Sequence, residues 1–194
     1  MRTAEITRKT RETDIELTLN LDGAGQFEGG SGIGFLDHML ELFARHALCD
    51  LTLKCKGDLQ VDGHHSVEDI GICLGSAIKQ AAGDKRGITR YGQWLLPMDE
   101  ALVLCALDFS GRAFLHCDLP LSARKIGDFD SELAEEFFRA TAMNAGLTLH
   151  IITMKPGNAH HVLEAAFKAF ARALRGAVAI DERVSGVPST KGVL

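Results

Sequence analysis

His64-His65-Ser66-Val67-Glu68 and His160-His161-Val162-Leu163-Glu164 are two copies of one pattern, His-His-x-x-Glu, placed about half a chain apart. Each copy begins an apolar-periodic segment that predicts a helix. One such pentapeptide would be a weak signal, because adjacent histidines are common on exposed helices. Two copies at corresponding positions indicate a duplicated chain with a metal-binding segment in each half.

The surrounding sequence predicts the same succession of elements in both halves: strand, strand, helix, strand, helix. Residues 3–9 and 14–22 are expected to form a hairpin, and residues 101–108 and 113–119 a second hairpin around Ser110-Gly111. The other expected elements are helices over 35–46, 64–82, 131–144 and 159–176, and strands over 51–56 and 147–152.

Two local features carry further expectations. Ser131 stands at the start of a predicted helix, where a serine hydroxyl can accept a hydrogen bond from a free backbone N–H group. The glycine-rich stretch 29–34 matches neither the Walker A spacing nor a dinucleotide-binding pattern. We therefore expect this stretch to be a flexible connector rather than a phosphate-binding loop.

Together these patterns predict an α+β fold with four helices packed between two mostly antiparallel sheets. The composition has no linker-like break near the middle of the chain. We therefore expect one domain over residues 1–194, built from repeats of about 1–92 and 93–180. A functional tail is expected over residues 181–194.

The bulk composition excludes several classes of protein. The net charge of −5 gives no reason to expect nucleic acid or an anionic membrane as a partner. No apolar run is long enough to cross a bilayer, and the N-terminus lacks the apolar core of a signal peptide. The cysteines form no Cys-x-x-Cys pair, which predicts reduced thiols and a cytoplasmic protein. They are Cys49, Cys55, Cys73, Cys105 and Cys117.

Helix geometry assigns divided roles to the two histidines of each segment. Residues four apart share a helix face, whereas neighbours point about 100° apart. The first histidine and the glutamate can therefore hold one metal, and the second histidine faces elsewhere. A pseudo-twofold axis would let His65 join the pair of the second half and His161 join the pair of the first.

The helix before each segment offers one further ligand, His38 in the first half and Glu136 in the second. A solvated helix face is a competing interpretation for Glu136, because Glu132 and Glu135 lie beside it. Imidazole and carboxylate ligands without thiolate favour manganese, iron or catalytic zinc over a structural zinc site.

Five segments extend this picture across nearly the whole chain, in order: residues 35–39 (FLDHM), 64–69 (HHSVED), 107–112 (LDFSGR), 158–169 (NAHHVLEAAFKA) and 188–194 (PSTKGVL). Together they closely resemble the imidazoleglycerol-phosphate dehydratase family of histidine biosynthesis. The resemblance implies a ribosomal protein S5 domain 2-like fold and a 24-subunit assembly with active sites between subunits. It also implies two Mn²⁺ ions per active site.

The same resemblance implies a reaction and a set of site residues. D-erythro-imidazoleglycerol phosphate would lose water through a metal-bridged imidazolate to give imidazoleacetol phosphate. Glu12 matches the acid/base glutamate. One metal would take His38, His65, His160 and Glu164, and the other His64, Glu68, His161 and position 136. The expected substrate and phosphate contacts are Glu12, His38, His46, Arg90, Arg112, Lys168, Ser189, Thr190 and Lys191.

One residue departs from the family pattern. The family usually has histidine before the Phe-Phe pair of the third helix, whereas this chain has Glu136. A carboxylate can still bind manganese, so the departure affects the tuning of one metal. Two other functions stay open at this point: a phosphohydrolase on the same scaffold, and a protein that stores metal ions.

Overall fold

The chain folds into two sheets with helices between them, and the computed structural model describes residues 1–192 and 194. Val193, which belongs to the tail motif, lies outside the described residues. The strands are β1 (Thr3–Lys9), β2 (Thr13–Asn20), β3 (Phe27–Gly30), β4 (Asp50–Gly57), β5 (Tyr91–Met98), β6 (Ala101–Asp108), β7 (Phe114–Asp118), β8 (Lys125–Ile126), β9 (Phe129–Asp130) and β10 (Thr148–Lys155). The helices are α1 (Gly34–Ala47), α2 (His64–Ala82), α3 (Leu133–Ala145) and α4 (Ala159–Val178).

The two large sheets have the same internal order. The first runs β1-β2-β4-β3 and the second runs β5-β6-β10-β7. In each sheet the first three strands pair antiparallel, and the fourth runs parallel to its neighbour. Alternating residues such as Ile15, Leu17 and Leu19 of β2 turn one face of the sheet into the core. This shared topology confirms the predicted duplication.

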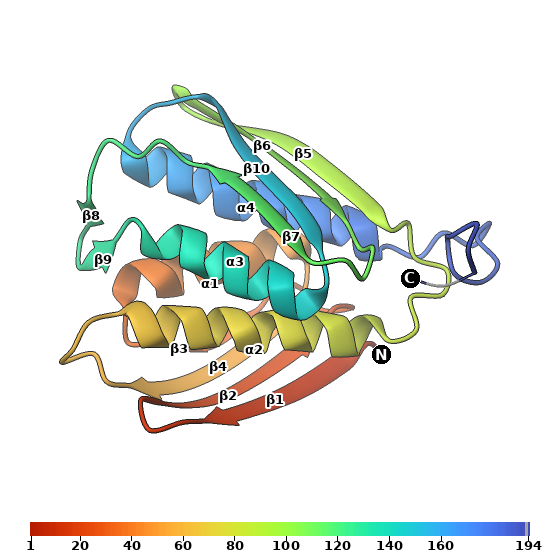
Figure 1. Ribbon diagram of the computed structural model, residues 1–194, viewed down its shortest axis with the longest axis horizontal. Helices are drawn as coiled ribbons and strands as arrows, with labels where there is room; N and C mark the ends of the chain where they lie inside the picture. Colours follow the sequence, from red (N-terminus) through yellow and green to blue (C-terminus); the bar gives the residue numbers. More distant parts are fainter. Residues whose placement is uncertain (193) are drawn as a thin grey trace.

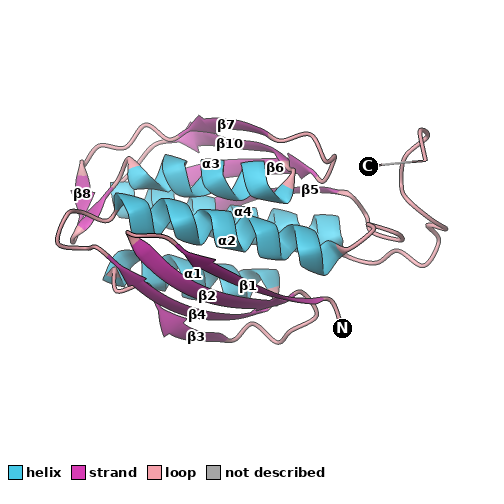
Figure 2. Cartoon of the chain, turned by 60° about the horizontal axis from the view of Figure 1, so that its bottom comes forward, coloured by secondary structure: helices cyan, strands magenta, loops and turns pink. Residues whose placement is uncertain are grey.

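Four helices form the middle layer, with one sheet on each outer side (Figure 1, Figure 2). Helix α2 packs on the first sheet and α4 on the second. Within the layer the helices pair across the repeats, α1 with α4 and α2 with α3. Phe43 of α1 stacks on Phe170 of α4 with ring centroids 5.6 Å apart. The two halves therefore share one core.

Glycines permit the closest contacts between these elements. A Cβ atom at Gly75 of α2 would lie 2.4 Å from the carbonyl oxygen of Thr141 in α3. A Cβ atom at Gly92 of β5 would lie 1.8 Å from the carbonyl oxygen of Ala173 in α4. A side chain at either position would push a helix away from its neighbour. Gly75 thus lets α2 pack closely on α3, and Gly92 lets α4 pack closely on β5. Both α2 and α4 begin with a His-His-x-x-Glu segment.

The predicted fold class is confirmed, but one predicted strand pairing is wrong. Strands β6 and β7 do not form a hairpin, because β10 lies between them in the sheet. The hairpin of the second half joins β5 to β6, with Met98 paired to Ala101. Alternation identified the strands but could not identify their partners, which β10 supplies from a distant part of the chain.

Three smaller expectations also need correction. Strands β3 and β5 were not predicted, and part of the expected connector 29–34 belongs to β3, which pairs with β4. Ser131 does not cap α3, since the N-cap is Glu132 without a side-chain hydrogen bond. The Ser131 hydroxyl instead donates to the carbonyl oxygen of Ala123, 2.8 Å away. It therefore fastens the loop that leads into α3.

The cysteines are free, as expected: Cys49, Cys73 and Cys105 are buried, and Cys55 and Cys117 are half-buried. Burial raises the pKa of Cys49 and of Cys117 to about 12. Among the described residues, none of the helices combines the length and apolar character that a membrane crossing requires.

Candidate functional site

Both His-His-x-x-Glu segments stand at the start of their helices, and the first histidine of each has a side-chain acceptor two residues before it. The backbone N–H of His64 donates to the side chain of Asp62, and that of His160 donates to the side chain of Asn158. Each acceptor stands two residues before its histidine and satisfies an N–H group that has no partner within the helix. Asn158 is the N-cap of α4, whereas the N-cap of α2 is Gly63, which makes no side-chain hydrogen bond.

His38, His160 and Glu164 come together between α1 and α4. The Nε2 atoms of His38 and His160 lie 3.3 and 3.1 Å from the same oxygen of Glu164, Oε2. Candidate ligand atoms of all three residues lie within 4.8 Å of one another. Lys168 donates to the other carboxylate oxygen at 2.5 Å. We refer to these four residues as the Glu164 cluster.

Glu164 is buried in this cluster, with only 7% of its surface exposed. Burial by itself raises the pKa of its carboxyl group, but the hydrogen bond and charge of Lys168 and the two histidines outweigh that effect. The pKa of Glu164 is therefore lowered, and the group is a carboxylate at neutral pH. Two imidazole nitrogens and one carboxylate oxygen form a donor set that suits a divalent transition metal.

The second histidines occupy different surroundings. The Nδ1 atom of His65 lies 3.0 Å from Asp58, and its Nε2 atom lies 3.7 Å from Glu12 in the β1–β2 turn. The Nδ1 atom of His161 lies 2.9 Å from Glu100 in the β5–β6 turn. Neither histidine belongs to the Glu164 cluster. Sequence reasoning missed Asp58 and Glu100, although an acidic residue in the loop before the first segment was a usable signal.

The remaining predicted ligands are not gathered within one chain. His64 and Glu68 are half-buried at the start of α2. Glu136 of α3 faces Arg139 at 4.0 Å. His161 shares its surroundings with carboxylates of the β5–β6 turn rather than with Glu68 or Glu136. One chain therefore brings together His38, His160 and Glu164, and leaves the other five predicted ligands apart.

The predicted phosphate contacts fall into two groups. Lys168 belongs to the Glu164 cluster, and the pKa of His46 on α1 is lowered by burial and then by the charges of Lys168 and Arg172. The other five belong to the C-terminal tail, which follows the far end of α4 (Figure 1), or lie beside it. These are Arg90, Arg112, Ser189, Thr190 and Lys191.

Arg90 holds the tail in place rather than pointing freely into solvent. Its guanidinium donates to both carboxylate oxygens of Asp108, at 2.7 and 3.1 Å, and to the carbonyl oxygen of Pro188 at 3.0 Å. Beside it, a cavity of about 370 Å³ is lined by cationic side chains. They are Lys79, Lys85, Arg112 and Lys191. Sequence reasoning missed the first two, which precede the second repeat without any motif.

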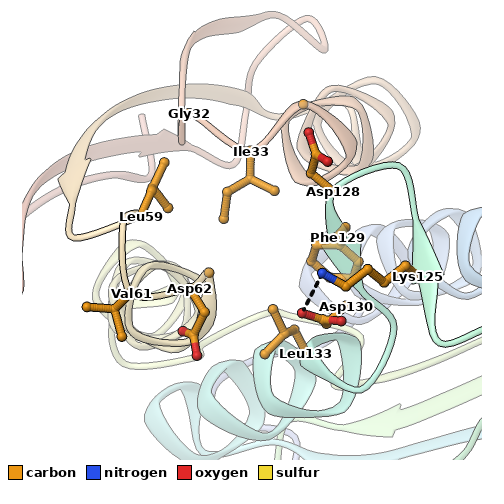
Figure 3. Close-up of a pocket in the computed structure, with 12 residues that line it drawn as sticks. Gly32, Ile33, Leu59, Val61, Asp62, Lys125, Asp128, Phe129, Asp130 and Leu133 are labelled. Atoms are coloured by element: carbon orange, nitrogen blue, oxygen red, sulfur yellow. Dashed lines mark ion pairs between the residues drawn. The ribbon is translucent and has the colours of Figure 1, made fainter.

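A larger cavity of about 420 Å³ lies close to the start of α2 and α3 (Figure 3). Leu59, Val61 and Leu133 surround it, and Lys125 pairs with Asp130 at 3.6 Å across its rim. None of the predicted metal or phosphate residues lines it. This cavity is therefore a neighbour of the candidate ligands and not the place where they meet.

Comparison with known proteins decides the family. Residues 31–174 match the family model described as imidazoleglycerol-phosphate dehydratase. The chain belongs to the imidazoleglycerol-phosphate dehydratase family. It is therefore a hydro-lyase that dehydrates imidazoleglycerol phosphate in histidine biosynthesis, and the phosphohydrolase and storage alternatives are set aside.

Relatives in this dehydratase family cover the whole chain. The chain is 58% identical over 194 residues to imidazoleglycerol-phosphate dehydratase of Thermoanaerobacter pseudethanolicus, covering all of both chains. It is also similar to the solved dehydratase of Staphylococcus aureus, with 40% identity, a TM-score of 0.84 and coverage of 92% and 99%. The dehydratase of Pyrococcus furiosus, solved in complex with (S)-C348, gives 38% identity, a TM-score of 0.83 and coverage of 97% and 100%.

Proposed function

We propose that this dehydratase converts D-erythro-imidazoleglycerol phosphate to imidazoleacetol phosphate and water at a site formed between subunits, with two Mn²⁺ ions per site. The observation that carries this proposal is the separation of the Glu164 cluster from the cationic tail region. We also propose the cytoplasm as its location, which the free cysteines support.

The donor atoms of the Glu164 cluster fit the proposed metal. A buried carboxylate lies between two imidazole rings whose Nε2 atoms point at the same oxygen. His38, His160 and Glu164, with His65, would hold one ion. The other would take His64, Glu68, Glu136 and His161. When bound, the ions supply positive charge that favours the imidazolate form of the substrate ring.

Glu12 is the proposed group that takes the carbon-bound proton. It lies on the exposed β1–β2 turn, and its backbone N–H donates to the Thr10 hydroxyl at 3.0 Å. Thr13 of the same turn donates from its hydroxyl to buried Asp69 at 2.5 Å, and Arg8 donates to Asp69 at 2.8 Å. Asp69 stands on α2 beside the first segment. The turn is thus fastened to the helix whose histidines it faces, which suits a base that must stay in position.

Within a single chain, the Glu164 cluster and the phosphate contacts of the tail lie too far apart to bind one substrate together. Helix α4 continues for 14 residues from Glu164 to Val178 (178 − 164), which at 1.5 Å per residue cover about 21 Å. Glu164 lies in its first turns, whereas the tail with Ser189 and Lys191 follows its far end (Figure 1). A small phosphorylated substrate cannot span that length. A second chain whose tail approaches the Glu164 cluster would bring both groups to one substrate, and a closed 24-subunit assembly is the form we propose for it.

Co-expression of two damaged chains tests this arrangement. His160→Ala removes a proposed metal ligand, and Lys191→Ala removes a proposed phosphate contact at the opposite end. Each variant alone should be nearly inactive with Mn²⁺ and imidazoleglycerol phosphate. In mixed assemblies some sites combine the intact metal ligands of a Lys191→Ala chain with the intact tail of a His160→Ala chain. Ketone formation should therefore return to a measurable fraction of wild type. Failure to recover activity in assemblies proven to be mixed would rule out the shared site.

A further inference from the structure

The second histidine of each His-His-x-x-Glu segment has a carboxylate on its Nδ1 atom. The Nδ1 atom of His65 lies 3.0 and 3.2 Å from the two oxygens of Asp58. The Nδ1 atom of His161 lies 2.9 Å from Oε2 of Glu100. Asp58 belongs to the loop between β4 and α2, whereas Glu100 belongs to the turn between β5 and β6. Two unrelated loops thus place a carboxylate on the same ring atom of corresponding histidines.

Each carboxylate is itself held in place. The second oxygen of Glu100 accepts a hydrogen bond from the backbone N–H of Asn158 at 2.6 Å. Gly157 leaves room for this contact, because a Cβ atom there would lie 2.4 Å from the same oxygen. Asp58 is less exposed, with 18% of its side chain accessible, and its carbonyl oxygen accepts from Val61 at 2.8 Å. The Glu100 carboxylate is therefore held by a second hydrogen bond, and Asp58 stands on a backbone turn that is closed by a hydrogen bond.

A carboxylate on Nδ1 has a definite effect on a neutral imidazole. It keeps the ring proton on Nδ1, leaves the lone pair of Nε2 free, and fixes the plane of the ring. Metal-binding histidines usually have such a partner, and its loss typically weakens metal affinity by about 10–100-fold. We propose that Asp58 and Glu100 are positioning residues that hold His65 and His161 with Nε2 free for the metal. This inference rests on the metal site of the proposed function.

Mn²⁺ titration of the assembled protein, followed by electron paramagnetic resonance of the free ion, tests the proposal. Asp58→Ala and Glu100→Ala should each weaken one class of Mn²⁺ site by roughly 10–100-fold. Asp58→Asn and Glu100→Gln keep an acceptor oxygen and should lose less. Gly157→Ala should weaken the His161 site without removing a polar group. Asp128→Asn, which changes an exposed carboxylate beside the cavity of Figure 3, is the control and should bind as wild type.

A double-mutant cycle separates positioning from a structural role. In a His65→Ala background, Asp58→Ala should cause no further loss of Mn²⁺ affinity, and the melting temperature of the metal-free protein reports any general damage. A further loss in that background, or wild-type affinity in the single variant, would overturn the proposal for Asp58. If the wild-type protein binds no Mn²⁺, the metal site of the proposed function fails instead, so the two failures are distinguishable.

Discussion

The two His-His-x-x-Glu segments share a sequence pattern and a position at the start of a helix, yet they stand in different surroundings. Glu164 of the second segment is buried and in contact with His38, His160 and Lys168. Glu68 of the first segment is half-buried and has no ion pair with any described residue. The difference arises from the neighbouring helices. Helix α1 carries His38 to the second segment, whereas the corresponding residue of α3 is Glu136, which faces Arg139 instead.

The duplication has repeated the ligands on each helix but not the groups that complete the ligand set. A ligand pair on one helix face is a property of local spacing. Its third and fourth partners come from elements that packing brings alongside. The following experiments test how far the two segments are equivalent, beginning with the largest expected effect.

Glu12 faces only the first segment, through His65, and its replacement should have the largest effect on turnover. Glu12→Gln removes the proposed base and keeps the size of the side chain. We expect turnover to fall by about 10²–10⁴-fold, as for loss of a general base. Mn²⁺ binding and the apparent substrate affinity should hardly change. Steady-state kinetics measures the effect, and the control is Asp14→Asn, which changes the half-exposed partner of Lys9. Wild-type-like turnover for Glu12→Gln would refute the assignment.

Removing the glutamate of each segment should affect metal binding in both halves but stability in only one. Glu164→Ala leaves His38, His160 and Lys168 without their shared acceptor, and the Lys168 side chain is only 17% accessible. We expect it to lower the free energy of unfolding of the metal-free protein by roughly 1–3 kcal/mol. Glu68→Ala should leave that free energy within about 0.5 kcal/mol, since it removes no such contact. Denaturant unfolding without metal gives both values, and equal effects would contradict the structural difference between the segments.

Asp69 should matter because it ties the β1–β2 turn to the first segment. It is buried and accepts hydrogen bonds from Arg8 and from the buried Thr13 hydroxyl. Asp69→Ala leaves that hydroxyl without its acceptor, so we expect a loss of roughly 1–3 kcal/mol in unfolding free energy. The turn that carries Glu12 should also loosen and reduce turnover. Unchanged stability would mean that the turn is held by other contacts.

Glu136→His should make the two metal sites more alike and is expected to have the smallest effect. One carboxylate is exchanged for an imidazole, and both groups bind manganese. We expect Mn²⁺ affinity at the site that position 136 serves to change by about tenfold or less, which corresponds to about 1.4 kcal/mol. Metal content per chain before and after the change measures it. Glu135→His, on the more exposed neighbouring position, should leave metal content unaltered.

Much of the fold could be predicted from periodicity, and the failures have physical causes. All four helices were expected close to their observed bounds, because their apolar faces repeat at helical spacing. Strand β3 was missed because it has four residues and two glycines. Strand β5 was missed because its exposed run lacks regular alternation, with burial changing little from Gln93 to Leu95. The false pairing of β6 with β7 followed from that omission.

The sequence predicted individual residues of the candidate site but not how those residues come together in space. His38, His160 and Glu164 were all expected as ligands of one metal, and they do lie together in one chain. The partition of the other ligands and the role of Glu12 stay predictions. Asp58 and Glu100 were missed because the sequence does not show that their loops lie against His65 and His161. The distance between the Glu164 cluster and the tail likewise could not be predicted from the sequence.

Spacing along the chain is enough to predict the two His-His-x-x-Glu segments, their place at helix starts and the repeated order of elements, because it sets which side chains share a face. Spacing does not reveal that α1 lies beside α4, that Glu164 is buried with Lys168, or that His65 and His161 each meet a carboxylate. Those contacts join residues from distant parts of the chain, and the packing of the shared core selects them.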